Sequence, residues 1–189
     1  MRRRVAVALF ALCLAGCGSM PVRRTYVLGG PPPVIGVRSE RGVPVIELRA
    51  VSVPDYLDTT DILRRAGPNE VGASETGRWG ERLSLGLADA LVSALLPRLP
   101  GRIVTSRPVD NPARSITVEV ESFDIAADGR CLLAARWRIA DGGRGTTSAA
   151  EFGAFSEIAT PPDDSSVAAA MTRAVDQLAE RIAATLDGE

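Results

Sequence analysis

The chain has 189 residues, of which 46% are hydrophobic and 24% charged, a balance that suits one globular domain with short extensions. It has 22 basic residues, all arginine, and 23 acidic ones, so the net charge is −1. The sequence contains no block of basic residues of the kind that indicates nucleic-acid binding. Histidine is absent, which excludes histidine-based nucleophile activation and histidine-rich zinc sites. We therefore expect a protein that is not an enzyme and that uses no metal or cofactor.

The N-terminus has the three parts of an export signal. Residues 2–4 are arginines, residues 5–14 form an apolar run too short to span a bilayer, and a small-residue site follows. Residues 14–17, Leu-Ala-Gly-Cys, are similar to the lipobox of bacterial lipoproteins, in which the cysteine thiol carries a diacylglyceryl group. This motif predicts cleavage between Gly16 and Cys17 and lipidation of Cys17. The alternative is an ordinary secretory signal with a chance cysteine.

Lipidation at Cys17 would divide the chain into a signal peptide (1–16), a lipidated tether (17–24) and a single domain (25–189). Each buried acyl methylene contributes about 0.8 kcal/mol, so two or three acyl chains hold a protein firmly on a membrane. Cys13 would leave with the signal and Cys17 would carry lipid, which leaves Cys131 without a partner for a disulfide bond. Membrane association of this mildly acidic domain therefore has to come from the anchor.

The domain is predicted to begin with two strands and a long connection. Residues 25–28 form the first strand, and the glycine- and proline-rich connection 29–43 is either a mobile loop or a contact loop; we expect a mobile one. Residues 44–53 alternate as a half-buried strand does. The row expected to face the core comprises Ile46, Leu48, Ala50 and Ser52.

A hairpin and a helix follow. Strands 61–66 and 70–74 flank Gly67-Pro68-Asn69, a sequence typical of a turn. Residues 80–97 are predicted to be helical because apolar residues recur at helical spacing. The polar stripe of this helix is narrow, so we expect the helix to be covered on two sides.

A short strand (102–107) precedes a long hairpin, whose strands 115–127 and 130–140 flank the turn signal Asp128-Gly129. The apolar residues of the first strand change parity, which predicts a bulge near Ser122. The second strand is expected to direct Arg136 and Arg138 outward, and residues 146–158 to add another strand. The inward row comprises Leu133, Ala135, Trp137 and Ile139.

The last predicted element is a helix over residues 164–186, with one apolar stripe and with Thr160 as its expected N-terminal cap. The order of elements predicts an α+β fold. In it, an antiparallel or mixed β-sheet carries the two main helices, about 80–97 and 164–186, on one face.

Several stretches, in this order, resemble one family. The lipobox, Val-Pro-Asp-Tyr-Leu-Asp at 53–58, Arg-Trp-Gly-Glu-Arg-Leu at 78–83 and the alanine-rich last helix are similar to the ABC-type transport auxiliary lipoproteins of the PqiC type. The resemblance spans nearly the whole chain. The sequence departs from the family at residues 59–63, Thr-Thr-Asp-Ile-Leu, where Arg-Pro-Gln-Ile-Val is more usual, and at Gly80 and Arg82, where Ala and Pro are usual.

This resemblance implies a lipoprotein on the periplasmic face of the outer membrane of a Gram-negative bacterium. Its implied partners are an MCE-domain protein and an inner-membrane transporter component, which together move lipids between membranes. Gly18 follows the cysteine, where Asp would indicate retention in the inner membrane in the best-studied sorting systems, so this position fits the outer membrane. A homo-oligomeric ring is compatible with the long apolar helix but is not required by it.

Tyr56, Leu57 and Trp79 lie in the stretches that carry the resemblance and are the candidates for partner contact. The alternative is core packing, because large apolar side chains usually serve the core.

Two other functions compete with lipid transport. A scaffold lipoprotein of another envelope complex would have the same anchor, and neighbouring genes for an MCE protein and a permease would argue against it. Asp55, Asp58 and Asp61 could supply a carboxylate pair for glycoside hydrolysis, but acids near a turn are usually solvated or cap a helix. An assay for glycan cleavage would separate that enzyme from a docking protein.

Overall fold

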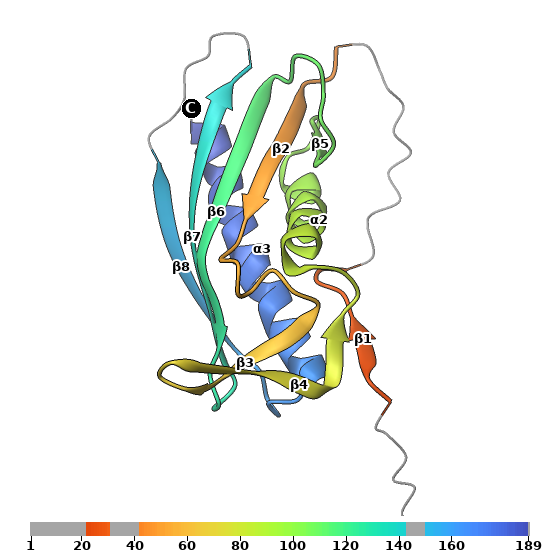
Figure 1. The fold of residues 1–189 in the computed structure, drawn as a ribbon. Coiled ribbons are helices and arrows are strands. Elements are labelled where there is room, and N and C mark those ends of the chain that lie inside the picture. The colour runs from red at the N-terminus through yellow and green to blue at the C-terminus, as the bar shows by residue number, and fades with distance from the viewer. Residues whose placement is uncertain (1–21, 31–41, 143–149, 189) are drawn as a thin grey trace, which may run out of the picture.

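A computed structural model describes residues 22–30, 42–142 and 150–188 and shows an α+β fold with two sheets and two main helices (Figure 1). The predicted signal peptide, Gly16 and Cys17, and parts of the connection 29–43 and of the strand 146–158, lie outside these residues. The described elements are β1 (Arg24–Tyr26), β2 (Val45–Ser52), β3 (Asp61–Gly67), β4 (Glu70–Trp79), α2 (Leu83–Leu95), η1 (Leu96–Arg98), β5 (Ile103–Thr105), β6 (Arg114–Ile125), β7 (Arg130–Asp141), β8 (Glu151–Ile158) and α3 (Asp164–Gly188).

The five-stranded sheet has the order β5-β2-β6-β7-β8 and is built around the predicted long hairpin. β6 and β7 pair antiparallel, and their register shifts between Val120 and Ser122, which confirms the bulge. The predicted inward row of β7 is buried, and Arg136 and Arg138 are exposed. Gly129 closes the hairpin at φ 85, and a Cβ there would lie 2.4 Å from the carbonyl oxygen of Ala159, so the turn needs a glycine.

The prediction for β2 was correct for only half of its buried row. Ile46 and Leu48 are buried, but Ala50 and Ser52 are exposed. The register of β2 against β6 shifts between Leu48 and Ala50, and one extra residue in a strand reverses which side chains face the core. Val51 therefore packs against the core in place of its neighbours.

Both helices lie on one face of the five-stranded sheet, as predicted, and contact each other (Figure 1). α2 packs against β2 and α3, whereas α3 packs against β7 and β8. α2 begins at Leu83 and not at Gly80, because the amide of Gly80 donates to the carbonyl of Tyr26 and continues the sheet. At its other end the chain tightens into η1, which contains Pro97.

The cap of α3 differs from the prediction. Asp163, directly before the helix, accepts a hydrogen bond from the amide of Ser166 at 2.8 Å, and its carbonyl accepts one from Val167 at 2.9 Å. This is the N-cap arrangement, in which a side-chain oxygen satisfies an amide of the first turn. Thr160 lies three residues farther from the helix and does not take this position.

The predicted single sheet is divided into two. The hairpin of β3 and β4 forms as expected, although β4 is longer than predicted and ends at Trp79. β1 pairs parallel with β4, and the resulting order is β1-β4-β3. This three-stranded sheet lies at the end of the molecule where the described chain begins (Figure 1).

Candidate docking groove between the helices

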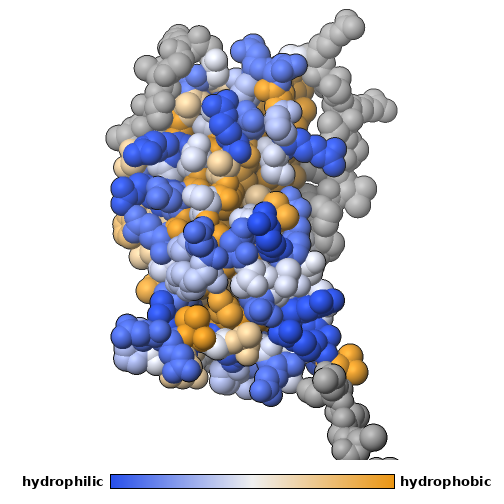
Figure 2. Space-filling view, in the orientation of Figure 1, coloured by the Kyte–Doolittle hydropathy of each residue, from blue (hydrophilic) through white to orange (hydrophobic). Residues whose placement is uncertain are grey.

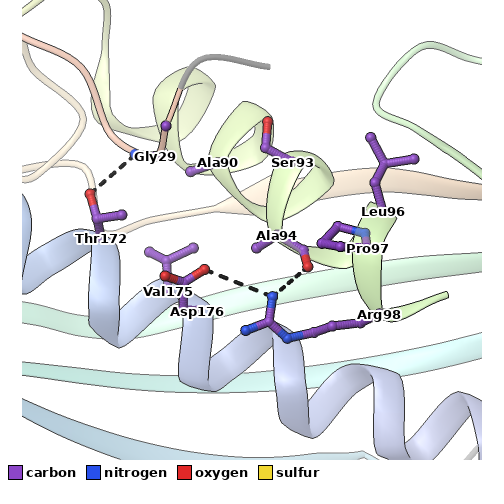
Figure 3. Close-up of a pocket in the computed structure, with 11 residues that line it drawn as sticks. Gly29, Ala90, Ser93, Ala94, Leu96, Pro97, Arg98, Thr172, Val175 and Asp176 are labelled. Carbon is purple, nitrogen blue, oxygen red and sulfur yellow. Dashed lines mark hydrogen bonds and ion pairs between the residues drawn. The ribbon is translucent and has the colours of Figure 1, made fainter. Parts of the chain in front are cut away.

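A groove of about 460 Å³ lies between α2, η1 and α3, on the side of the helices that the sheet does not cover (Figure 3). Its floor is small and apolar because Ala90 and Ala94 face it from α2 and Val175 faces it from α3. Leu96 and Pro97 of η1 extend the apolar lining. A volume of this size is in the range of small-molecule sites, and it also admits an apolar side chain of a partner protein.

The groove is closed at one end by the start of the connection 29–43. Gly29 has φ 77, and a Cβ at this position would lie 3.2 Å from both Cα and Cβ of Ala90. Glycine is thus favoured there for its backbone conformation and for the close approach to α2. Its amide donates to the hydroxyl of Thr172 on α3 at 3.1 Å, which ties the connection to both helices.

Two polar side chains at the groove, those of Thr172 and Arg98, are hydrogen-bonded within the protein. The hydroxyl of Thr172 donates to the carbonyl of Ala168 at 2.9 Å while accepting from Gly29. The guanidinium of Arg98 donates to the carbonyl of Ala94 at 2.6 Å and lies 3.9 Å from a carboxylate oxygen of Asp176 (Figure 3). The groove therefore suits an apolar group held by burial.

The predicted contact residues are elsewhere, and they separate into two kinds. Leu57 and Trp79 are 5% and 4% exposed and belong to the hydrophobic core. Tyr56 is 44% exposed and lies at the surface. Of the three, Tyr56 alone offers much surface to a partner, and its contact with one stays a prediction.

Tyr56, in the loop between β2 and β3, is part of a surface cluster that joins this loop to β3 and β6. Its hydroxyl donates to Asp124 of β6 at 3.4 Å, and the same carboxylate oxygen accepts from Nε of Arg65 at 3.0 Å. Partial burial, followed by the nearby charge of Asp124, raises the pKa of Tyr56. The phenol consequently stays protonated at neutral pH and acts as a hydrogen-bond donor.

Two of the three acids considered for catalysis have structural roles. Asp58 accepts from the amide of Ser84 at 3.1 Å and pairs with Arg82 at 3.3 Å, so it caps the start of α2. The hydrogen bond from Ser84 lowers the pKa of Asp58. Asp61 pairs with Arg23 at 2.9 Å, which holds the chain before β1 against β3. These contacts favour the structural interpretation over a carboxylate pair for hydrolysis.

A buried polar network joins the three-stranded sheet to α3. Asp164, 5% exposed, accepts from Ser74 at 2.8 Å, from Thr76 at 2.7 Å and from Arg64 at 2.9 Å. Burial by itself raises the pKa of Asp164, but these hydrogen bonds outweigh it and the pKa is lowered. This network was not predicted, because its members are separated by up to 100 residues in the sequence.

Within the described ranges, no group of three or more His, Cys, Asp or Glu is arranged to hold a metal ion. No helix in this part of the chain is long and apolar enough to cross a membrane. Cys131 is buried on β7, and burial raises the pKa of its thiol to about 12. It therefore stays a protonated core side chain at neutral pH.

Comparison with known proteins identifies the family. The family model of the ABC-type transport auxiliary lipoprotein component matches residues 26–183, which is most of the chain. The chain belongs to this family. The matched region includes the five-stranded sheet, β3, β4, α2 and most of α3, so the groove and the polar network lie within the family domain.

Individual relatives agree with this assignment. The chain is 28% identical over 135 residues to the intermembrane transport lipoprotein PqiC of Escherichia coli (strain K12), an alignment that covers 69% of this chain and 71% of PqiC. The match to PqiC of Shigella flexneri has the same identity and coverage. The chain is thus a transport auxiliary lipoprotein component by family, and its similarity to PqiC extends over most of both sequences.

Two solved structures share the fold. A crystal structure of an uncharacterized protein matches with a TM-score of 0.74 and 19% identity, over 87% of this chain and 99% of its own. Protein XCC0632 from Xanthomonas campestris matches with a TM-score of 0.60 and 16% identity, over 88% and 93%. At these identities the likeness concerns the arrangement of sheets and helices.

Proposed function

We propose that this auxiliary lipoprotein is anchored at the periplasmic face of the outer membrane through lipid on Cys17. There it docks the assembly of an MCE-domain protein and an inner-membrane transporter component that moves lipids between membranes. The match to the transport auxiliary family over residues 26–183 is the observation that carries this proposal. The proposed division into a signal (1–16), a tether (17–24) and a domain (25–189) supplies the anchor.

The geometry supports docking as the task of the domain. The groove between α2 and α3 has an apolar floor, and its Thr172 and Arg98 side chains are hydrogen-bonded within the protein, so it can receive an apolar group from a partner. Tyr56 adds an exposed aromatic side chain with a fixed hydroxyl. Tyr and other amphipathic residues are enriched where proteins meet because they combine apolar area with a hydrogen bond.

The anchor is tested in the native host by intact-mass measurement and by labelling cells with an alkyne analogue of palmitate. The wild-type chain is expected to begin at residue 17 and to carry the label on Cys17. The Cys17→Ala variant should lose the label and should no longer separate with outer-membrane vesicles. An unlabelled residue 17 in the wild-type protein would contradict the anchor.

The transport assignment is tested separately by purifying the tagged lipoprotein from host membranes under mild conditions. Recovery of the MCE-domain protein at near-stoichiometric amounts is the expected result. Recovery of an unrelated envelope complex without any MCE protein would favour the scaffold alternative. The Cys17→Ala variant is the comparison, because its domain sequence is unchanged and residue 17 cannot carry lipid.

A further inference from the structure

The five-stranded sheet has two edges of very different character. β5, at one edge, is three residues long, which is a common way to protect an edge from unwanted pairing. β8, at the other edge, is eight residues long and contains no proline. No other described strand lies beyond β8, so its second row of amides and carbonyls faces outward (Figure 1). Such an edge can accept another strand.

The open face of β8 and β7 carries exposed apolar side chains next to this edge. Phe152 and Ile158 of β8 are 55% and 58% exposed, and Leu132 of β7 is 44% exposed. Ala134 and Ala154 face each other between them. Figure 2 views this open face and shows apolar side chains among the charged ones. Arg136 and Arg130 of β7 pair with Phe152 and Ile158, so charged side chains border these apolar ones. Exposed apolar side chains on an edge strand indicate an interaction surface.

The helix side of β8 carries two acids, of which one is already neutralised. Glu157 accepts hydrogen bonds from Nε of Arg173 on α3 at 2.6 Å and from the side-chain amide nitrogen of Gln177 at 2.5 Å. Glu151, at the other end of the strand, has a carboxylate that a basic residue on an added strand could pair with. An incoming strand therefore needs apolar side chains on the open face, and a basic side chain suits its other face near Glu151.

A second copy of the chain does not fit this edge well through its own β8, and its other sheet edge, β5, offers only three residues to pair with the eight of β8. Antiparallel pairing of two β8 strands places their long axes in opposite directions, so the ends that carry β1 point away from each other (Figure 1). Two copies anchored through residue 17 in one membrane cannot meet in this way. Parallel pairing of two β8 strands places the open face of one copy on the same side of the joined sheet as the helix-covered face of the other. The two apolar rows then lie on opposite sides and do not meet.

We propose that β8 is a docking edge for an extended segment of a different protein, which adds to the five-stranded sheet as a sixth strand. Its residues alternate, with apolar side chains beside Phe152 and Ala154 and a basic side chain near Glu151. The inference rests on the proposed function, which supplies the anchored orientation and the MCE-domain protein as the partner. The main-chain hydrogen bonds give affinity and the alternating side chains give specificity.

Hydrogen exchange tests the edge in the wild-type protein. The lipidated chain in detergent is mixed with the purified MCE-domain protein, and amide exchange is compared with that of the chain alone. Slower exchange confined mainly to β8 is expected in the complex, because its outward amides become hydrogen-bonded. Binding without any change in β8 would overturn the inference and leave the proposed function intact. Lack of binding by the MCE-domain protein would overturn both.

Two lysine variants on the same open face separate edge docking from general face contact. Ala154→Lys places a charge on β8 and should weaken binding of the MCE-domain protein at least tenfold. Thr117→Lys, on the central strand β6, is the matched control and should stay within twofold of the wild type. Equal loss in both variants would overturn strand addition, and concentration-dependent protection of β8 in the chain alone would show a second copy in its place. Phe152→Lys replaces Ala154→Lys if thermal unfolding shows that the latter is misfolded.

Discussion

The two sheets are held in the molecule by different kinds of contact. In the five-stranded sheet, β6 and β7 bury nearly every second side chain against the helices. In the three-stranded sheet, most side chains of β3 and β4 are exposed or half-buried, and Ile62 and Trp79 make its main core contacts. Ion pairs such as Arg64 with Asp164 connect this sheet to the rest. We therefore expect the end that carries β1 to respond to charge and pH more than the rest of the molecule does.

The largest effect is expected where apolar burial is deepest. Trp137 on β7 is fully buried, and its indole donates to Thr185 of α3 at 3.4 Å. Trp137→Ala should lower the free energy of unfolding by about 3–5 kcal/mol, through lost burial and a cavity. Urea denaturation followed by circular dichroism measures it. The neighbouring exposed residue gives the control, since Arg138→Ala should change stability by no more than about 0.5 kcal/mol. A similar loss in both would contradict the comparison.

The second effect concerns the polar network between the three-stranded sheet and α3. Asp164→Asn should lower the free energy of unfolding by about 2 kcal/mol, because charged hydrogen bonds from Arg64, Ser74 and Thr76 are weakened. Hydrogen exchange should also quicken more in β3 and β4 than in β6 and β7. Asp187→Asn is a matched control on the same helix, because its ion pair with Arg102 is exposed. An unchanged exchange rate in β3 and β4 would argue that this sheet is held by apolar contacts alone.

The same carboxylate predicts a pH dependence. The pKa of Asp164 is lowered in the folded protein, so the unfolded chain binds the proton more readily. Its stabilising contribution is therefore complete above the unfolded pKa of about 3.9 and is lost as the pH falls through the lower folded value. The difference in stability between wild type and Asp164→Asn should stay constant from pH 7 to pH 5 and shrink below about pH 4. A constant difference down to pH 2 would contradict this assignment.

A smaller effect is expected at the junction of the β2–β3 loop and α2. Asp58→Ala removes the side chain that accepts from the amide of Ser84, and losing such a cap costs about 1 kcal/mol. Exchange of the first amides of α2 should quicken while the end of the helix stays unchanged. Asp55→Ala, in the same loop, is the control and should leave α2 unaffected. Equal effects of both substitutions would indicate a general charge effect.

Local patterns predicted the five-stranded sheet better than the three-stranded one. The β6–β7 hairpin, its bulge and its inward row follow from side-chain alternation around Asp128-Gly129, and the structure confirms them. The row of β2 was predicted wrongly after Leu48, because the bulge arises from pairing with β6 and leaves no local mark. The separation into two sheets depends on the pairing of β1 with β4, more than 50 residues apart.

The candidate sites show the same limit. The sequence drew attention to Tyr56, Leu57 and Trp79 as large side chains in characteristic stretches, but burial of the last two depends on the tertiary packing. The groove was not predicted, since its floor is made of small residues on two helices about 80 residues apart. Small residues at helical spacing, Ala90 and Ala94, were the available signal. Such residues are equally typical of closely packed helices, so the sequence alone could not distinguish a groove from tight helix packing.

The smallest effect on stability is expected at the surface cluster of Tyr56, Arg65 and Asp124, where β3 of the three-stranded sheet contacts β6. Tyr56→Phe removes one long hydrogen bond to Asp124 and should change the free energy of unfolding by no more than about 0.5 kcal/mol. The pKa of Tyr56 is the more sensitive measurement, because the negative charge of Asp124 contributes to raising it. Ultraviolet titration should therefore give a lower pKa for Tyr56 in Asp124→Asn than in the wild type. If the pKa of Tyr56 stays the same in that variant, burial alone raises it, and the cluster with Arg65 does not orient the tyrosine for a partner.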